Sequence, residues 1–189
     1  SIGSSNGLEL RTGHLARFAD AAVVASRGES SVLATVVTKA AAPGGNGFTA
    51  LTVDFRQSAA AIGKIPTNYL RRELGQSDAD VLVSRVIDRS LRPLIPSTVT
   101  DTIQLQCKPL AVDGDSDEVT LAINAASTAL QLSPIPMIGP SAAVRVALID
   151  GKPLLNPSRS ARRESSMDLL ITGGEEGKTL MIEMDGKEV

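Results

Sequence analysis

The chain has 189 residues, 42% of them apolar, and its 19 Lys and Arg side chains nearly balance 21 Asp and Glu. This length and composition favour one compact domain and exclude a disordered chain. One cysteine and one histidine exclude a disulfide framework and a Cys/His zinc site. No apolar run reaches the roughly 18 residues that cross a bilayer, so we expect no membrane span, and the first residues do not resemble a signal peptide. Because the net charge is −2, a nucleic-acid site must be a local basic patch.

Short apolar runs separated by turn residues predict strands along the whole chain. They cover residues 21–25, 31–38, 49–55, 102–112, 142–149, 167–172 and 178–184. The glycine cluster at 44–47 has the composition of a strand connection, and no Gly-Lys-Ser or Gly-Lys-Thr follows it. This excludes a phosphate loop of the Walker kind at that position.

Two helices are predicted among these strands. The first begins after Ser77, an N-cap residue, and ends before Pro93. Its buried side is predicted to carry Leu82, Val86 and Ile87. The second covers 117–131, where apolar residues recur at helical spacing and many alanines indicate close packing. The expected fold class is therefore α+β, a mixed or antiparallel sheet packed with two principal helices.

Basic side chains are concentrated around the first predicted helix and the long irregular loop, 57–76, that precedes it. Three of them lie at i, i+4 and i+7, on one helix face: Arg85, Arg89 and Arg92. Two more lie in the loop: Arg71 and Arg72. One guanidinium group can donate hydrogen bonds to two phosphate oxygens at once, so this distribution of arginines favours a polyanionic ligand. The alternative is a solvated helix in which Asp88 pairs with the arginines three positions before it and four after it.

The tyrosine beside the loop arginines strengthens the nucleic-acid interpretation. Tyr69 is the only tyrosine of the chain and is followed by Leu70 and the two arginines. An aromatic ring that stacks on a base, next to cations that hold its phosphate, is typical of single-stranded nucleic-acid binding. The alternative is a partly buried ring that anchors the loop.

The sequence offers no candidate catalytic residue and no candidate metal ligand. His14 is the only possible imidazole base and is isolated near the first residues. The acids between Asp113 and Glu118 fit a turn and a helix start as well as a cation site, and they lack the spacing of an EF-hand loop.

Four segments of the chain, in this order, resemble the first RNase PH-like half of the polynucleotide phosphorylase family. They are LELRTGHLARFADAAVV, GKIPTNYLRRE, SDADVLVSRVIDRSLRPLIP and LAVDGDSDEVTLAINAASTAL. The resemblance covers almost the whole chain. The variant TNYLRRE is similar to the animal mitochondrial form, whereas bacterial enzymes carry a Phe-Phe-Arg-Arg loop.

This resemblance implies an RNase PH-like fold, of the ribosomal protein S5 domain 2 type, over residues 1–185. Residues 186–189 are then the start of a linker to a helical domain. The implied activity is phosphate-dependent 3′ to 5′ RNA degradation, with Mg²⁺ as cofactor and inorganic phosphate as co-substrate. The implied assembly is a homotrimeric ring around single-stranded RNA, and the implied location is mitochondrial. The RNA-binding residues that match the family are Tyr69, Leu70, Arg71 and Arg72 in the channel loop and the anion-binding pair Arg85 and Arg89 on the helix.

The catalytic acids and the metal belong to the second half of the family's proteins. Here Ser166-Met167-Asp168 takes the place of an Asp-Met-Asp stretch, so the first acid is a serine. We therefore expect this half to bind RNA and to support the ring, and to lack the catalytic acids. The intact protein is expected to be an enzyme, whereas these 189 residues alone are expected to be inactive. The alternatives are a purely structural ring subunit that does not contact RNA, and a small-molecule kinase of related fold, for which the ATP loop is missing.

Overall fold

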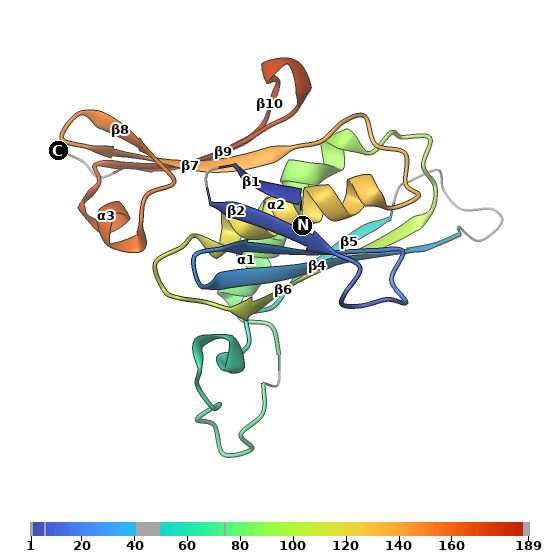
Figure 1. The fold of residues 1–189 in the computed structure, drawn as a ribbon, viewed down its shortest axis with the longest axis horizontal. Helices are drawn as coiled ribbons and strands as arrows, with labels where there is room; N and C mark the ends of the chain where they lie inside the picture. Colours follow the sequence, from blue (N-terminus) through green and yellow to red (C-terminus); the bar gives the residue numbers. More distant parts are fainter. Residues whose placement is uncertain (1, 6, 41–49, 74, 187–189) are drawn as a thin grey trace.

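The computed structural model describes residues 2–5, 7–40, 50–73 and 75–186, which form two β-sheets with two long helices between them (Figure 1). One sheet has six strands in the order β1-β2-β3-β4-β6-β5. Its strands are β1 (Ile2–Ser5), β2 (Leu8–Thr12), β3 (Ala21–Arg27), β4 (Ser30–Lys39), β5 (Leu51–Phe55) and β6 (Thr102–Ala111). β5 runs parallel to β6 and the other pairs are antiparallel, so this sheet is mixed.

The second sheet has four antiparallel strands in the order β10-β9-β7-β8. Its strands are β7 (Ala142–Ile149), β8 (Lys152–Leu155), β9 (Met167–Gly173) and β10 (Thr179–Gly186). The predicted mixed sheet packed with two principal helices is present, and the structure adds that the strands divide into two sheets. Alternating apolar residues locate strands, but they do not say which strands pair with one another.

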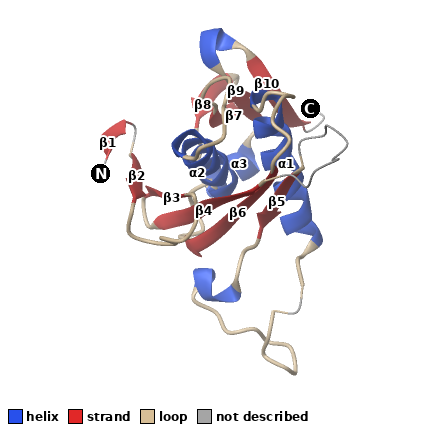
Figure 2. Cartoon of the chain, turned by 90° about the vertical axis from the view of Figure 1, so that its right-hand side faces the viewer, coloured by secondary structure: helices blue, strands red, loops and turns tan. Residues whose placement is uncertain are grey.

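The helices α1 (Asp78–Leu91) and α2 (Glu118–Leu132) form the middle layer (Figure 2). α2 contacts β3 and β4 on one side and β7 on the other, and α1 contacts β5 and β10. Four alanines of α2 are completely buried: Ala122, Ala125, Ala126 and Ala129. Their small side chains let both sheets approach the same helix, which confirms the predicted close packing.

The helix ends lie where local sequence chemistry predicts them. Ser77 caps α1 in a capping box, in which its hydroxyl accepts from the amide of Asp80 and the Asp80 carboxylate accepts from the amide of Ser77. Pro93 lies in the short 3-10 helix η2 (Arg92–Leu94) that follows α1. The Asp117 carboxylate caps α2. Both predicted helices are confirmed, and the third, α3 (Arg159–Glu164), is too short for a periodic signal.

The buried face of α1 differs from the prediction. Ile87 is buried as expected, but Leu82 is 61% exposed. Ser84 faces the six-stranded sheet instead, where its hydroxyl accepts from the amide of Phe55 at 2.9 Å. The small side chain of Ser84 allows α1 to lie close to the end of β5. The buried face of α1 therefore differs from the face that the spacing of apolar residues predicts.

The four-stranded sheet has one face on the helices and an opposite face rich in exposed apolar side chains. The strand register places these side chains on the same side: Val144, Val146, Leu148, Leu155, Met167, Leu169, Ile171, Ile182 and Met184. We call this set the apolar outer face. Leu155, Ile182 and Met184 are each at least 60% exposed.

Some predictions fall outside the described residues. These are the glycine cluster at 44–47 and, within the predicted linker, residues 187–189. Gly186, the first residue of that predicted linker, is the last residue of β10. Within the described part of the chain, no helix combines the length and the apolar character needed to cross a membrane.

Candidate nucleic-acid interface

The loop between β5 and α1, described over residues 56–73 and 75–77, projects from the body of the molecule (Figures 1 and 2). It contains the short 3-10 helix η1 (Ala59–Ile62). Its base is held by side chains next to α1: the amide of Gln57 donates to Asp80 at 3.2 Å, and the side chain of Gln76 donates to the carbonyl of Phe55 at 3.0 Å. The loop therefore leaves the body from a fixed base.

Asn68 closes the tip of this loop. Its Oδ1 accepts from the amide of Arg72 at 3.0 Å, its Nδ2 donates to the carbonyl of Arg72, and its own carbonyl accepts from the amide of Arg71 at 2.9 Å. Arg71 adopts a left-handed backbone with φ of 49°. Asparagine commonly closes turns through such side-chain contacts to the backbone. The tip is thus a defined turn that presents Tyr69, Leu70 and the two arginines.

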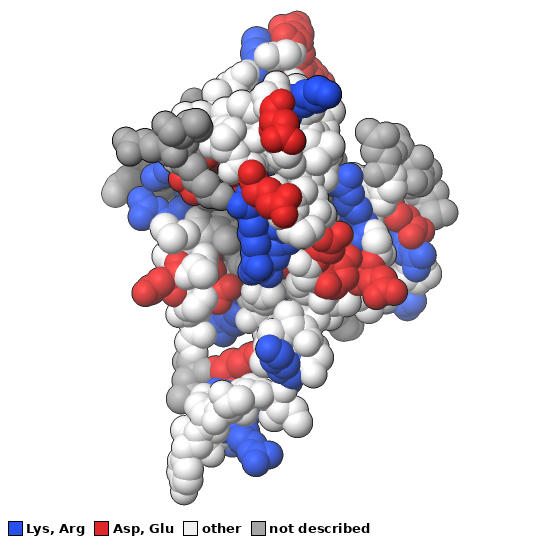
Figure 3. Space-filling view, turned by 90° about the vertical axis from the view of Figure 1, so that its left-hand side faces the viewer, with Lys and Arg blue, Asp and Glu red and all other residues white. Residues whose placement is uncertain are grey.

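The side chains at the tip are open to solvent. Tyr69 is fully exposed and Leu70 is 55% exposed. The interpretation of Tyr69 as a partly buried anchor is therefore wrong. Figure 3 shows cationic side chains on the lower projection of the molecule. An uncovered ring and an aliphatic side chain thus stand next to two guanidinium groups.

Two of the three helix arginines are free to meet a ligand. Arg85 and Arg89 are exposed on α1, and neither has an ion pair or side-chain hydrogen bond with another described residue. Arg92 forms an ion pair with Asp88 at 2.6 Å and donates to the carbonyl of Leu51 at 3.2 Å. The solvated-helix alternative thus holds for the Asp88–Arg92 pair, whereas Arg85 and Arg89 stay available.

The structure adds one cation that the sequence did not single out. Arg56, directly after β5, lines a polar hollow at the base of the loop together with Arg72. Both side chains are exposed. Arg56 shares no regular spacing with the other arginines, and only the course of the loop brings it near Arg72.

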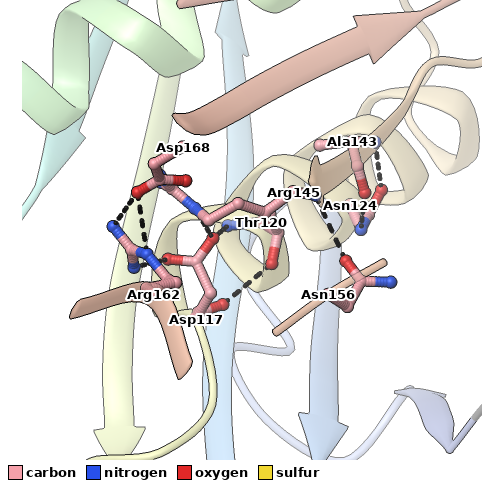
Figure 4. Close-up of polar contacts among 8 residues, drawn as sticks. All are labelled: Asp117, Thr120, Asn124, Ala143, Arg145, Asn156, Arg162 and Asp168. Atoms are coloured by element: carbon pink, nitrogen blue, oxygen red, sulfur yellow. Dashed lines mark hydrogen bonds and ion pairs between the residues drawn. The ribbon is translucent and has the colours of Figure 1, made fainter. Parts of the chain in front are cut away.

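Asp168, the remaining acid of the Ser-Met-Asp stretch, belongs to a cluster of four charged side chains (Figure 4). Arg145 Nη1 donates to both Asp168 oxygens at 3.0 Å, and Arg145 Nε donates to Asp117 Oδ2 at 2.9 Å. Arg162 contacts Asp168 Oδ2 at 2.8 Å and Asp117 Oδ1 at 3.5 Å. We call these four residues the charge quartet. Burial opposes the charged form of Arg145, but Asp117 and Asp168 outweigh it and raise the pKa of the guanidinium.

The quartet does not fit a metal site. Both oxygens of Asp168 already accept hydrogen bonds from guanidinium groups. Ser166, at the position of the first acid, donates its hydroxyl to the carbonyl of Leu148 at 3.2 Å. Among the residues that the structure describes, no group of three or more His, Cys, Asp or Glu side chains is placed to hold a metal ion.

The acids before α2 form a turn. Asp113 accepts from the backbone amides of Asp115 and Ser116, both at 2.8 Å. Burial opposes the charged form, but these hydrogen bonds outweigh it and hold the pKa of Asp113 well below its usual range. Of the two interpretations left open for this segment, the structure supports the turn. His14 lies exposed in the β2–β3 loop.

Family models match both parts of the chain. The model of the 3′ exoribonuclease family, domain 1, matches residues 6–136, and the model of domain 2 of the same family matches residues 139–189. Asp117 thus lies in the first match, and its partners in the quartet lie in the second.

Curated relatives include bacterial proteins named polyribonucleotide nucleotidyltransferase. The one from Elusimicrobium minutum is 43% identical over 183 residues, which is 96% of this chain and 26% of the relative. The one from Granulibacter bethesdensis is 42% identical over 182 residues, 96% of this chain and 25% of the relative. The chain therefore spans about a quarter of the length of these relatives.

Solved structures share the fold. The Archaeoglobus fulgidus exosome with RNA bound to the active site matches with a TM-score of 0.76 and 17% identity, over 96% of this chain and 78% of that chain. Rice Rrp46 matches with a TM-score of 0.76 and 18% identity, over 99% of this chain and 85% of that chain. The predicted RNase PH-like fold is confirmed. Because the domain 1 model covers most of the sequence and the architecture agrees, the chain belongs to the 3′ exoribonuclease family of RNase PH domains.

Proposed function

We propose that this chain is the RNA-guiding, ring-forming half of a phosphorolytic 3′ to 5′ exoribonuclease of the polynucleotide phosphorylase type. The observation that carries the proposal is the projecting loop, which holds a fully exposed Tyr69 next to Arg71 and Arg72. Identity of 42–43% to polyribonucleotide nucleotidyltransferases supports it. The RNA bound in the similarly folded Archaeoglobus exosome accords with an RNA ligand.

The loop and α1 would act on the RNA strand before the chemical step. Arg71 and Arg72 at the tip, with Arg85 and Arg89 on the exposed side of α1, bind backbone phosphates without regard to sequence. The ring of Tyr69 stacks on a base, which every nucleotide can supply. RNA that is bound in this way is oriented toward the catalytic centre, which we place outside these residues.

The reaction proposed for the longer protein is attack of inorganic phosphate on the terminal phosphodiester, which releases a nucleoside diphosphate. Mg²⁺ would neutralise charge on the attacking phosphate and on the leaving oxygen. The pairing of Asp168 with Arg145 and Arg162 supports placing that metal elsewhere. We accordingly propose that the 189-residue chain alone does not catalyse phosphorolysis.

Two narrower assignments belong to the same proposal. Tyr69 and Leu70, in place of two phenylalanines, favour an animal mitochondrial type and hence a mitochondrial location. A homotrimer built from RNase PH-like units would bring several copies of the loop around one strand. In such a ring, loops on neighbouring subunits bind the same RNA, which strengthens attachment without new contacts within one subunit.

Binding of a fluorescently labelled single-stranded RNA, followed by anisotropy over a salt series, tests the proposal. If about four phosphates are bound, the logarithm of affinity falls with the logarithm of salt concentration at a slope near roughly −3. The variant Arg71→Ala/Arg72→Ala is expected to bind more weakly and with a flatter slope. Arg17→Ala/Lys152→Ala, which removes two exposed cations from other elements, is the matched control.

Equal, feeble binding by both variants and the parent chain would contradict the proposal. It would favour the second candidate, a structural ring subunit that does not contact RNA. In that case Arg89→Ala is expected to lower the melting temperature, because the side chain would then serve an interface between chains. Unchanged melting together with weaker RNA binding supports the RNA-guiding function.

A further inference from the structure

The hollow at the base of the projecting loop combines two cations from separate segments. Arg56 directly follows β5, and Arg72 is the last residue of the turn at the loop tip; both line the hollow, together with Gln57 and Asn68. Both arginine side chains are exposed, and neither forms a side-chain hydrogen bond or ion pair with another described residue. Two arginines that line one hollow without a carboxylate partner favour an anionic ligand there.

Two carboxylates also line this hollow, but backbone donors occupy them. Glu73 accepts from the amide of Ala59 at the start of η1. Asp80 accepts from the amides of Ser77 at 3.1 Å and Gln57 at 3.2 Å, and the N-terminus of α1 compensates its charge. Neither carboxylate pairs with an arginine of the hollow within the described part of the chain. The acids thus fix the backbone around the hollow and leave the cations to a ligand.

Both cations project from fixed backbone. The amide of Arg56 donates to the carbonyl of Cys107 at 3.2 Å, which ties this residue to the edge of the six-stranded sheet. Asn68 holds both backbone polar groups of Arg72. Because the backbone is already fixed, mainly the two arginine side chains lose conformational entropy when the ligand arrives.

We propose that this hollow is a phosphate subsite in which Arg56 and Arg72 together bind one backbone phosphate of single-stranded RNA, with Asn68 as a positioning residue. The inference rests on the proposed function and adds Arg56 to the RNA path. The strand would pass from the exposed ring of Tyr69 at the tip toward the base of the loop. Arg suits this role because its planar fork contacts two phosphate oxygens at once.

A double-mutant cycle on the full chain tests the subsite, with labelled single-stranded oligoadenylate as the probe. Arg56→Gln and Arg72→Gln are each expected to weaken binding several-fold and to flatten the salt slope by up to roughly 0.7, the value for one phosphate of a single strand. The double variant is expected to bind little worse than either single variant, because both side chains serve the same phosphate. Arg17→Gln, an exposed arginine in the β2–β3 loop, is the charge-matched control.

The outcomes separate this inference from the function on which it rests. If Arg56→Gln binds like Arg17→Gln while Arg71→Ala/Arg72→Ala weakens binding, the subsite is wrong and the proposed function stands. If the two effects simply add, the two arginines do not share a phosphate, and the subsite is again wrong. If none of these variants changes binding, the proposed function itself fails.

Asn68 supplies an independent readout. Asn68→Ala keeps both cations but frees the backbone of Arg72, so we expect weaker binding with a salt slope close to that of the parent chain. The coupling between Arg56 and Arg72 should also decrease in this background. Unchanged affinity and unchanged coupling would contradict a positioning role for Asn68. Because Asn68 is exposed, the melting temperature should stay the same and show that the fold is intact.

Discussion

Tyr69 contributes little to the stability of the fold, because its ring is fully exposed. An aromatic side chain stabilises a protein mainly through the area that it buries, and this ring buries none. Its position at the tip of a closed turn, beside two arginines, is instead suited to a ligand with a flat aromatic face. A substitution of Tyr69 can therefore change RNA binding without changing the stability of the fold.

Replacing Tyr69 should change RNA binding and leave the melting temperature unchanged. Base stacking on an aromatic side chain contributes about 1–3 kcal/mol per base, so Tyr69→Ala should weaken affinity by roughly 5-fold to 150-fold. Tyr69→Phe keeps the ring and should bind like the parent chain. Anisotropy titration with labelled RNA measures both. Equal loss in the two variants would show that the hydroxyl, and not the ring, makes the contact.

The charge quartet joins four elements at once. Asp117 caps α2, Arg145 lies on β7, Arg162 lies on α3 and Asp168 lies on β9. Side-chain exposure in the quartet is between 9% and 28%, so water screens these charges only partly. The quartet therefore ties the four-stranded sheet to the start of α2 and fixes how the two meet.

Removal of one charge from the quartet should destabilise the chain. Asp168→Asn leaves the guanidinium of Arg145 with one carboxylate partner in place of two. Breaking a fully buried pair costs about 3–5 kcal/mol, and partial exposure reduces the expected loss here to about 2 kcal/mol. Urea denaturation measures it. Asp185→Asn, opposite Asp168 on β10 and exposed, is the matched control and should change stability little; a similar loss in both variants would argue against the quartet.

Local chemistry explains which elements could be predicted from the sequence. Ser77 and Pro93 locate α1 because capping and the missing proline amide act within one helical turn. The buried side of the same helix was predicted less well, since Leu82 is exposed and Ser84 is buried. Which side of a helix is buried depends on the partner that packs against it, and spacing alone carries no information about that partner.

The candidate site also has a part that the local sequence shows and a part that depends on tertiary packing. Arg71 and Arg72 follow one another in the sequence, so their cluster is visible without a structure. Arg56 joins them only through the course of the loop, and Arg145, which pairs with Asp168, is 23 residues away from it in the sequence. Contacts of this kind depend on tertiary packing, which no local pattern encodes. The sequence therefore locates the local part of the candidate interface and misses the part that folding adds, and RNA binding by these residues stays a prediction.

The molecule as a whole exposes an extended apolar surface to solvent. The apolar outer face runs across all four strands of the second sheet, and Ile182 and Met184 on it are 60% and 64% exposed. A continuous apolar patch of this extent is uncommon on a monomer and favours association. The 189-residue chain alone is therefore expected to self-associate through this face.

Charged substitutions on this face should oppose self-association. Ile182→Lys/Met184→Lys is expected to shift the chain toward monomer in size-exclusion chromatography with light scattering, because a buried unpaired charge opposes association. Thr179→Lys/Lys178→Gln, at the exposed first residue of β10 and the exposed residue before it, is a control that should leave association unchanged. If the parent chain is monomeric at high concentration, the apolar outer face does not drive association.

The packing of α2 between the two sheets determines whether the chain can be cut into two independently folding parts. The boundary between the two family models lies between residues 136 and 139, just beyond α2. Yet α2 packs against strands on both sides of that boundary, and its buried alanines face two sheets at once. A protein cut there would keep most of the buried core in its first part, but it would expose the side of α2 that contacts β7 and leave the four-stranded sheet without the helices that cover it. The two family matches thus cover two parts of one folding unit, because residues from both contribute to the same core.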